Sequence, residues 1–142
     1  MPTITVPATI KHLTSAKEYL REAVPPEFAA QTSNVLLVAE ELLMNVFSYA
    51  YADGTEGRAS VSLDKRLVEG KEMLVFAVTD WGKPFDPFKE VSAPDLSLDI
   101  DSRPVGGLGV FLIKQVSERQ TYAYVNGTNH IEIFFGKEPI SA

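Results

Sequence analysis

The segment from Asn34 to Tyr51 constrains the fold of this chain most strongly. It reads NVLLVAEELLMNVFSYAY, so apolar side chains fall on nearly every side of a helix. A helix that is apolar all round must be covered by other elements, because water would otherwise contact its hydrophobic surface. Pro26 favours a helix start upstream, and Asp53-Gly54 favours an end. The sequence therefore predicts one long buried helix with the rest of the chain packed around it.

An amphipathic helix is predicted before this buried one. From Ile10 onward, Leu13, Ala16 and Leu20 recur at helical spacing until Pro25 interrupts the pattern. A short third helix, VFLIKQVSE, is predicted after the glycines at 106–109. The chain thus offers three helices that can cover a sheet.

Alternating apolar and β-branched residues predict the strands of that sheet. The predicted strands are Thr3–Val6, Ser60–Val68, Glu72–Thr79, Thr121–Val125 and His130–Phe135. Glu69-Gly70 and Asn126-Gly127 separate two strand pairs, and such dipeptides favour hairpin turns. The segregated order of helices and strands predicts an α+β fold: a two-layer α/β sandwich in which helices cover one face of a mixed, mostly antiparallel sheet.

Length and charge limit the organisation further. The 142 residues predict one domain over 1–142, and the 13 basic and 19 acidic side chains give a net charge of −6, which disfavours direct contact with nucleic acid or an anionic membrane. The segment 81–105 has no regular period, and loops longer than about 12 to 15 residues are often lids or binding loops. We expect a lid over residues 86–106.

The residue inventory excludes several chemistries. The chain has no cysteine, so disulfides and thiolate metal sites are excluded. Its two histidines, His12 and His130, lie in different predicted elements and are too few for a metal cluster. No signal peptide or membrane span is predicted, and a cytoplasmic location is expected.

Polar side chains form a stripe on the predicted buried helix. At about 100° per residue, Glu41 and Asn45 lie about 40° apart and Ser48 lies about 20° to the other side. A carboxylate in buried surroundings needs a partner, a metal or water. The stripe has two interpretations. It is the solvent-exposed side of a surface helix, or it provides a carboxylate base beside an amide oxygen that can ligate Mg²⁺.

Two further motifs follow along the chain. Asp80 ends an apolar strand and precedes Trp81-Gly82, so it is either a turn residue or an acceptor for an exocyclic amine. The run Gly106–Gly109 precedes a helix, where free amides and the helix dipole favour phosphate. Neither GxxxxGK[ST] nor a GxGxxG after the first strand is present, which disfavours the P-loop and dinucleotide folds.

The order and spacing of the three motifs resemble a known ATP-binding domain. The motifs are Glu41-Leu-Leu-Met-Asn45, Asp80-Trp-Gly-Lys-Pro-Phe-Asp-Pro87 and Gly106-Gly-Leu-Gly109. They resemble the Bergerat fold shared by gyrase, heat-shock chaperones, histidine kinases and MutL. The short chain and the ending GGLGVFLIKQ resemble most the bacterial anti-sigma-factor serine/threonine kinases of the RsbW and SpoIIAB type, over residues 3–135.

The resemblance implies roles at the phosphate end of an ATP site. Glu41 would be the general base that deprotonates an acceptor hydroxyl, and Asn45 would ligate the Mg²⁺ that bridges the ATP phosphates. The late glycine motif would supply a lid hinge and phosphate-facing amides; its residues are Gly106, Gly107, Leu108 and Gly109. Phosphoryl transfer depends largely on such positioning and charge neutralisation.

The resemblance also implies roles at the adenine end. Asp80 would bind the adenine amine, Gly82 would allow close approach, and the Thr128 hydroxyl would assist there. Three residues depart from the family pattern. Pro84 stands where many relatives have a second glycine, and Tyr49 stands where some have a histidine. Val105 stands where some have a lid arginine, whose role Arg103 can take over. ATP binding is still expected despite these departures, whereas they leave the catalytic rate open.

The implied function is an ATP-dependent serine/threonine kinase acting as an anti-sigma factor. Its partners would be a small STAS-type anti-anti-sigma substrate, a sigma factor and a second copy of itself. The alternative is a nucleotide-dependent switch that binds a partner with little or no transfer. The catalytic half of a histidine kinase would need a dimerising hairpin with an acceptor histidine, and a gyrase- or MutL-like ATPase would need a transducer domain; neither is predicted.

Overall fold

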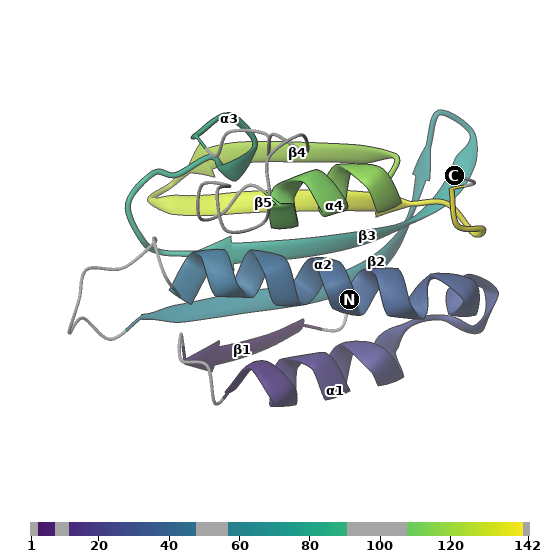
Figure 1. The fold of residues 1–142 in the computed structure, drawn as a ribbon, viewed down its shortest axis with the longest axis horizontal. Helices are drawn as coiled ribbons and strands as arrows, with labels where there is room; N and C mark the ends of the chain where they lie inside the picture. The colour runs from purple at the N-terminus through teal and green to yellow at the C-terminus, as the bar shows by residue number, and fades with distance from the viewer. Residues whose placement is uncertain (1–2, 8–11, 48–56, 91–107, 141–142) are drawn as a thin grey trace, which may run out of the picture.

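The structure, a computed structural model, contains a five-stranded sheet covered by helices on one face (Figure 1). It describes residues 3–7, 12–47, 57–90 and 108–140. The strands, in the spatial order β1-β2-β3-β5-β4, are β1 Thr3–Pro7, β2 Arg58–Val68, β3 Lys71–Asp80, β4 Arg119–Val125 and β5 Thr128–Phe135. This confirms the predicted α+β sandwich, with one refinement: all four strand pairings are antiparallel.

Three helices form the second layer. Helices α1 Leu13–Ala23, α2 Thr32–Asn45 and α4 Leu108–Val116 lie on the same face of the sheet (Figure 1). The core between the layers consists of alternate strand residues and the inner faces of the helices; fully buried examples are Leu20, Val35, Leu43, Val61, Leu74, Phe76, Ile113, Ile133 and Phe135. Within the described ranges, no helix is long and apolar enough to cross a membrane.

Both predicted hairpins are confirmed by their turn geometry. Glu69 and Gly70 have φ angles of 52° and 82°, and Asn126 and Gly127 have φ angles of 53° and 77°. Two consecutive residues with positive φ are typical of the type I′ turn, whose twist matches that of the flanking strands. The second turn fixes the β4–β5 register, pairing Val125 with Thr128.

The predicted long helix is divided in two. Pro26–Gln31 forms the 3-10 helix η2, and α2 begins only at Thr32, because Phe28 leaves the helical region at φ −111° and ψ 15°. The Gln31 side chain is buried at the junction and donates to the carbonyl oxygens of Gly136 and Glu138, both at 3.0 Å. The predicted continuation of the helix past residue 47 lies outside the described residues.

The predicted loop over 81–105 contains a short helix, so its description as irregular throughout was wrong. Helix α3 spans Pro87–Glu90. Asp86 begins it: its Oδ1 accepts from the Phe88 N–H at 2.9 Å, and its carbonyl accepts from the Lys89 N–H at 3.1 Å. A proline at the first helical position completes a favourable start. Most of the predicted lid, residues 91–106, lies outside the described residues.

Candidate functional site

The last turns of α2 carry the first pair of predicted site residues. Glu41 and Asn45 lie four positions apart on this helix, so they share one face. Leu42, Leu43 and Val46 around them are buried in the core, which fixes the direction of that face. The polar stripe is therefore placed at the boundary between the core and the surface.

Gly109, in the first turn of α4, lies against the Glu41 side chain. A Cβ atom at Gly109 would stand 2.1 Å from Glu41 Oε2 and 2.8 Å from its Cδ. Such contacts do not occur between real atoms, so only glycine fits beside this carboxylate in its present position. The structure thus brings the late glycine motif to the helix that carries Glu41 and Asn45, although Gly106 and Gly107 lie outside the described residues and Leu108 is described only as the start of α4.

Asp80 closes β3, the central strand of the sheet. It is 5% exposed, and its Oδ1 accepts hydrogen bonds from the Gly82 N–H and from Asn129 Nδ2, both at 2.9 Å. Among the described residues, no donor reaches Oδ2. Gly82 therefore contributes a backbone donor that helps to orient Asp80.

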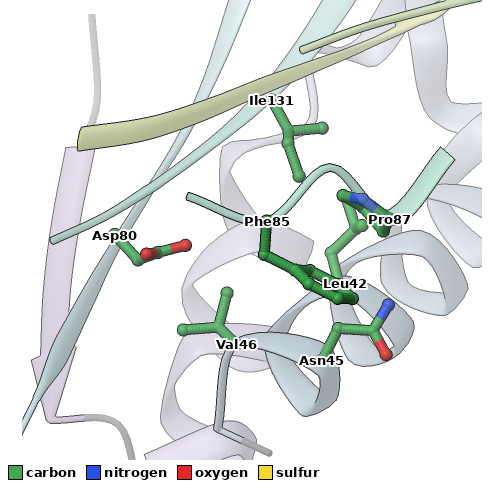
Figure 2. A pocket seen from close by; sticks show the side chains of 7 residues that line it. All are labelled: Leu42, Asn45, Val46, Asp80, Phe85, Pro87 and Ile131. Atoms are coloured by element: carbon green, nitrogen blue, oxygen red, sulfur yellow. The ribbon is translucent and has the colours of Figure 1, made fainter. Parts of the chain in front are cut away.

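Asp80 and Asn45 line one pocket between α2 and the sheet (Figure 2). Its walls are apolar apart from these two side chains and consist of Leu42, Asn45, Val46, Asp80, Phe85, Pro87 and Ile131. In Figure 2, the Asp80 carboxylate extends toward the Phe85 ring, while Asn45 and Val46 come from the end of α2. The pocket thus combines apolar walls with a buried carboxylate, a lining whose chemistry suits an apolar ring that carries an exocyclic amine.

The two carboxylates of the site have raised pKa values. Burial raises the pKa of Glu41 above its ordinary value, and the neighbouring Glu40 carboxylate raises it further. Burial also raises the pKa of Asp80, while the hydrogen bonds from Asn129 and Gly82 act in the opposite direction. A carboxylate with a raised pKa is a stronger base, which suits Glu41 for accepting a proton.

The structure places Asn129, and not Thr128, beside Asp80. Asn129 is the register partner of Asp80 between β5 and β3. Thr128 lies one position earlier, at the hairpin turn, and its hydroxyl donates to the Val125 carbonyl at 2.7 Å. Asn129 was not predicted, because the Gly127-Thr128 pair resembles the family motif in which a hydroxyl assists. Alternation along the strand from the buried Ile131 and Ile133 was the signal that could have identified it.

The site has few groups that could hold a metal ion. Within the described ranges, no cluster of three or more His, Cys, Asp or Glu side chains is present. Asn45 offers an amide oxygen at the pocket, and Mg²⁺ typically binds through one or two protein oxygens together with substrate phosphates and waters. Asn45 would therefore supply one protein oxygen to an ion that arrives with a phosphorylated ligand.

Of the residues that depart from the family pattern, the structure describes Pro84. Pro84 lies on the exposed turn that follows Gly82. Ser48, Tyr49, Arg103 and Val105 lie outside the described residues.

Comparison with known families identifies the domain. The family described as the histidine kinase-like ATPase domain matches residues 6–135, which is most of the chain. No curated protein matches the chain. The matched range includes both the Asn45–Asp80 pocket and Gly109.

Proposed function

Because the chain belongs to the histidine kinase-like ATPase family, whose domain binds ATP, we propose that it is a protein serine/threonine kinase acting as an anti-sigma factor. In this proposal it transfers the γ-phosphate of ATP to a hydroxyl of a small STAS-type anti-anti-sigma protein. It sequesters a sigma factor once that partner is phosphorylated.

The observation that carries this proposal is the placement of Glu41. Its carboxylate has a raised pKa, lies against Gly109 and stands one helical turn before Asn45. In this proposal the phosphates of a nucleotide with its base at Asp80 extend past Asn45 toward Glu41. The pairing of an adenine acceptor with a base at the phosphate end supports transfer to a hydroxyl.

The transfer step follows from these positions. The acceptor oxygen bonds to the γ-phosphorus while the bond from that phosphorus to the bridging oxygen breaks, and ADP leaves. The hydroxyl proton passes to the Glu41 carboxylate. Asn45 would hold a Mg²⁺ ion through its amide oxygen, and this ion would neutralise phosphate charge.

The adenine end provides binding and orientation. Asp80 Oδ2 accepts from the exocyclic amine, and the apolar walls, Phe85 and Ile131 among them, exclude water from the base. The Gly106–Gly109 segment contributes amides toward the phosphates in this proposal. Thr128 was expected to assist at adenine; its hydroxyl donates to the Val125 carbonyl, and the side chain that donates to Asp80 is Asn129.

The proposal is tested by incubating the purified chain with γ-labelled Mg·ATP and the small proteins encoded beside it. We expect label on a serine or threonine of one of them. Glu41→Gln should reduce the transfer rate by about 10²- to 10⁴-fold, because the proton acceptor is lost while ATP binding persists. Glu40→Gln is the matched control, since Glu40 is the adjacent carboxylate and faces Lys17 at 3.7 Å.

The outcomes separate the two candidate functions. Tight ATP binding with no transferred label favours the nucleotide-dependent switch, which the Pro84 departure also favours. Equal transfer by wild type and Glu41→Gln contradicts the assigned base. Label on the chain's own histidines would instead indicate histidine kinase chemistry.

The protein partners are part of the proposal. We propose a homodimer in which each copy binds nucleotide, with the sigma factor and the anti-anti-sigma protein competing for it. Sedimentation velocity of the chain, alone and with each partner, tests these assemblies; a monomer that binds neither partner in the presence of Mg·ATP would contradict them.

A further inference from the structure

Asn129 is a buried side-chain amide that holds the loop after β3. It is 2% exposed, and its Nδ2 donates to Asp80 Oδ1 at 2.9 Å and to the Lys83 carbonyl at 2.8 Å, with a longer contact of 3.5 Å to the Gly82 carbonyl. An asparagine amide has two N–H donors. Both are therefore used to join Asp80 to the turn that follows it.

The oxygen of the same amide holds one wall of the pocket. Asn129 Oδ1 accepts from the Phe85 N–H at 3.0 Å and from the Tyr122 hydroxyl. The orientation of the amide follows from its neighbours, because Asp80 and Lys83 offer acceptors while Phe85 offers a donor. One side chain thus holds both the polar acceptor and the backbone of Phe85, whose side chain lines the pocket.

These contacts decide which oxygen of Asp80 faces a ligand. Asn129 and Gly82 both donate to Oδ1, and among the described residues Oδ2 has no donor. A fixed carboxylate oxygen accepts a hydrogen bond from an amino group. It repels a carbonyl oxygen at the same position, so the fixed orientation discriminates between the two groups.

We propose that Asn129 is a positioning residue that sets the base preference of the pocket. By holding Asp80 and Phe85 it makes the pocket favour a 6-aminopurine nucleotide over a 6-oxopurine nucleotide. The proposal rests on the nucleotide-binding part of the proposed function and is independent of phosphate transfer. Asn129 acts through Asp80 and Phe85 and has no assigned role in the chemical step.

The test is calorimetric titration of the full chain with Mg·ATP and with Mg·GTP. Wild type should bind ATP at least about tenfold more tightly than GTP, the value of roughly one charge-assisted hydrogen bond. Asn129→Leu, of similar size and without donors, should weaken ATP binding about tenfold and leave GTP binding nearly unchanged, since GTP does not use Asp80 Oδ2. The ATP to GTP ratio should therefore fall toward one.

A matched control separates positioning from general damage. Thr128→Val removes the adjacent hydroxyl, which donates to the Val125 carbonyl at 2.7 Å, and should keep the wild-type ratio. A purely structural role of Asn129 would lower both affinities equally. An equal loss for both nucleotides, or an unchanged ratio in Asn129→Leu, overturns the proposal.

A second measurement keeps the proposal testable if Asn129→Leu does not fold. In wild type, both Nδ2 protons of Asn129 should exchange slowly with solvent and shift on addition of Mg·ATP, as measured by NMR. Exchange at the rate of a free amide would overturn the proposal. ATP binding without transfer would remove only the kinase proposal, whereas a wild type that binds neither nucleotide would overturn both.

Discussion

Asp80 accepts from Gly82 and Asn129 through Oδ1, and we propose that its other oxygen, Oδ2, accepts from the adenine amine. Asp80→Asn retains an oxygen that accepts from Gly82 and Asn129, but it places an amide N–H where the carboxylate accepted. We expect ATP affinity to fall about 10- to 100-fold, because a donor then faces the adenine amine. Titration calorimetry measures this loss, and undiminished ATP affinity would contradict the assigned acceptor.

The same variant makes a prediction for stability. Because burial raises the pKa of Asp80, the folded wild type loses stability as pH rises from the ordinary value of 3.8 through the raised one. Asp80→Asn has no charge to desolvate, so its free energy of unfolding should lack this decline. Chemical denaturation of both proteins across that pH window provides the measurement, and parallel curves would count against the burial argument.

Gly109 provides a test of the position of Glu41. Gly109→Ala forces the Glu41 carboxylate to move, and a displacement of this size should reduce phosphate transfer by about tenfold or more. Stability should change by less than about 1 kcal/mol, because alanine favours the helix and the glutamate side chain can rotate. Gly136→Ala is the matched control: its Cβ would stand 2.3 Å from Glu118 Oε2, away from the pocket. Equal transfer rates in both variants would show that the placement of Glu41 is unimportant.

Some site residues could be predicted from local pattern and others could not. Glu41 and Asn45 share a helix face by their spacing alone, and Asp80 ends an apolar strand. Strand alternation places Asn129 on the buried face of β5, but its pairing with Asp80 depends on the register between β3 and β5, which no local turn sets because those strands are distant in sequence. The proximity of Gly109 to Glu41 likewise arises from packing between α4 and α2.

At the level of elements, Gln31 joins the start of α2 to the chain after β5. Gln31→Leu leaves the Gly136 and Glu138 carbonyls without their side-chain donor and should lower the free energy of unfolding by about 1–3 kcal/mol. Asn34→Ala is the control, because it removes only the 2.9 Å bond to Gln31 Oε1 and keeps both donations. Urea denaturation compares them, and an equal effect of the two substitutions would contradict this anchoring role.

The elements differ in how well the sequence predicted them. Both hairpins were predictable: Asn126-Gly127 is a favoured type I′ pair, and Gly70 lies between two strand patterns, although a positive φ such as that of Glu69 is uncommon for a non-glycine residue. The division between η2 and α2 was not, because it depends on burying Phe28 and Gln31 against distant segments. Helix α3 was missed because one turn is too short to show a hydrophobic period.

At the scale of the whole molecule, the face of the sheet opposite α1, α2 and α4 contributes its own stability. Met73, Val75 and Phe134 form a second buried cluster there, and the Arg66 guanidinium lies 5.8 Å from the Phe134 ring centroid and donates to Glu132 at 2.8 Å. This bond is the main cause that lowers the pKa of Glu132. The Arg66 side chain thus covers part of the apolar surface of this cluster.

The low pKa of Glu132 predicts an acid-sensitive contribution to stability. The contribution is fully present above the ordinary value of 4.5 and is lost as pH falls through the lowered folded value. Glu132→Gln should cost about 0.5–1 kcal/mol near neutral pH and little in strong acid. Glu72→Gln, from an exposed pair with Lys137 at 3.5 Å, is the control and should have almost no effect. A pH-independent loss in Glu132→Gln would contradict the assignment.

We propose that ATP binds with its base in the Asn45–Asp80 pocket and its phosphates toward the Glu41–Gly109 contact. The most direct measurement is a crystal structure of the chain with Mg²⁺ and a non-hydrolysable ATP analogue. We predict the adenine amine at Asp80 Oδ2, the phosphates near Asn45 and Gly109, and Glu41 facing the terminal phosphate. A nucleotide bound elsewhere, or with its base away from Asp80, would contradict this account.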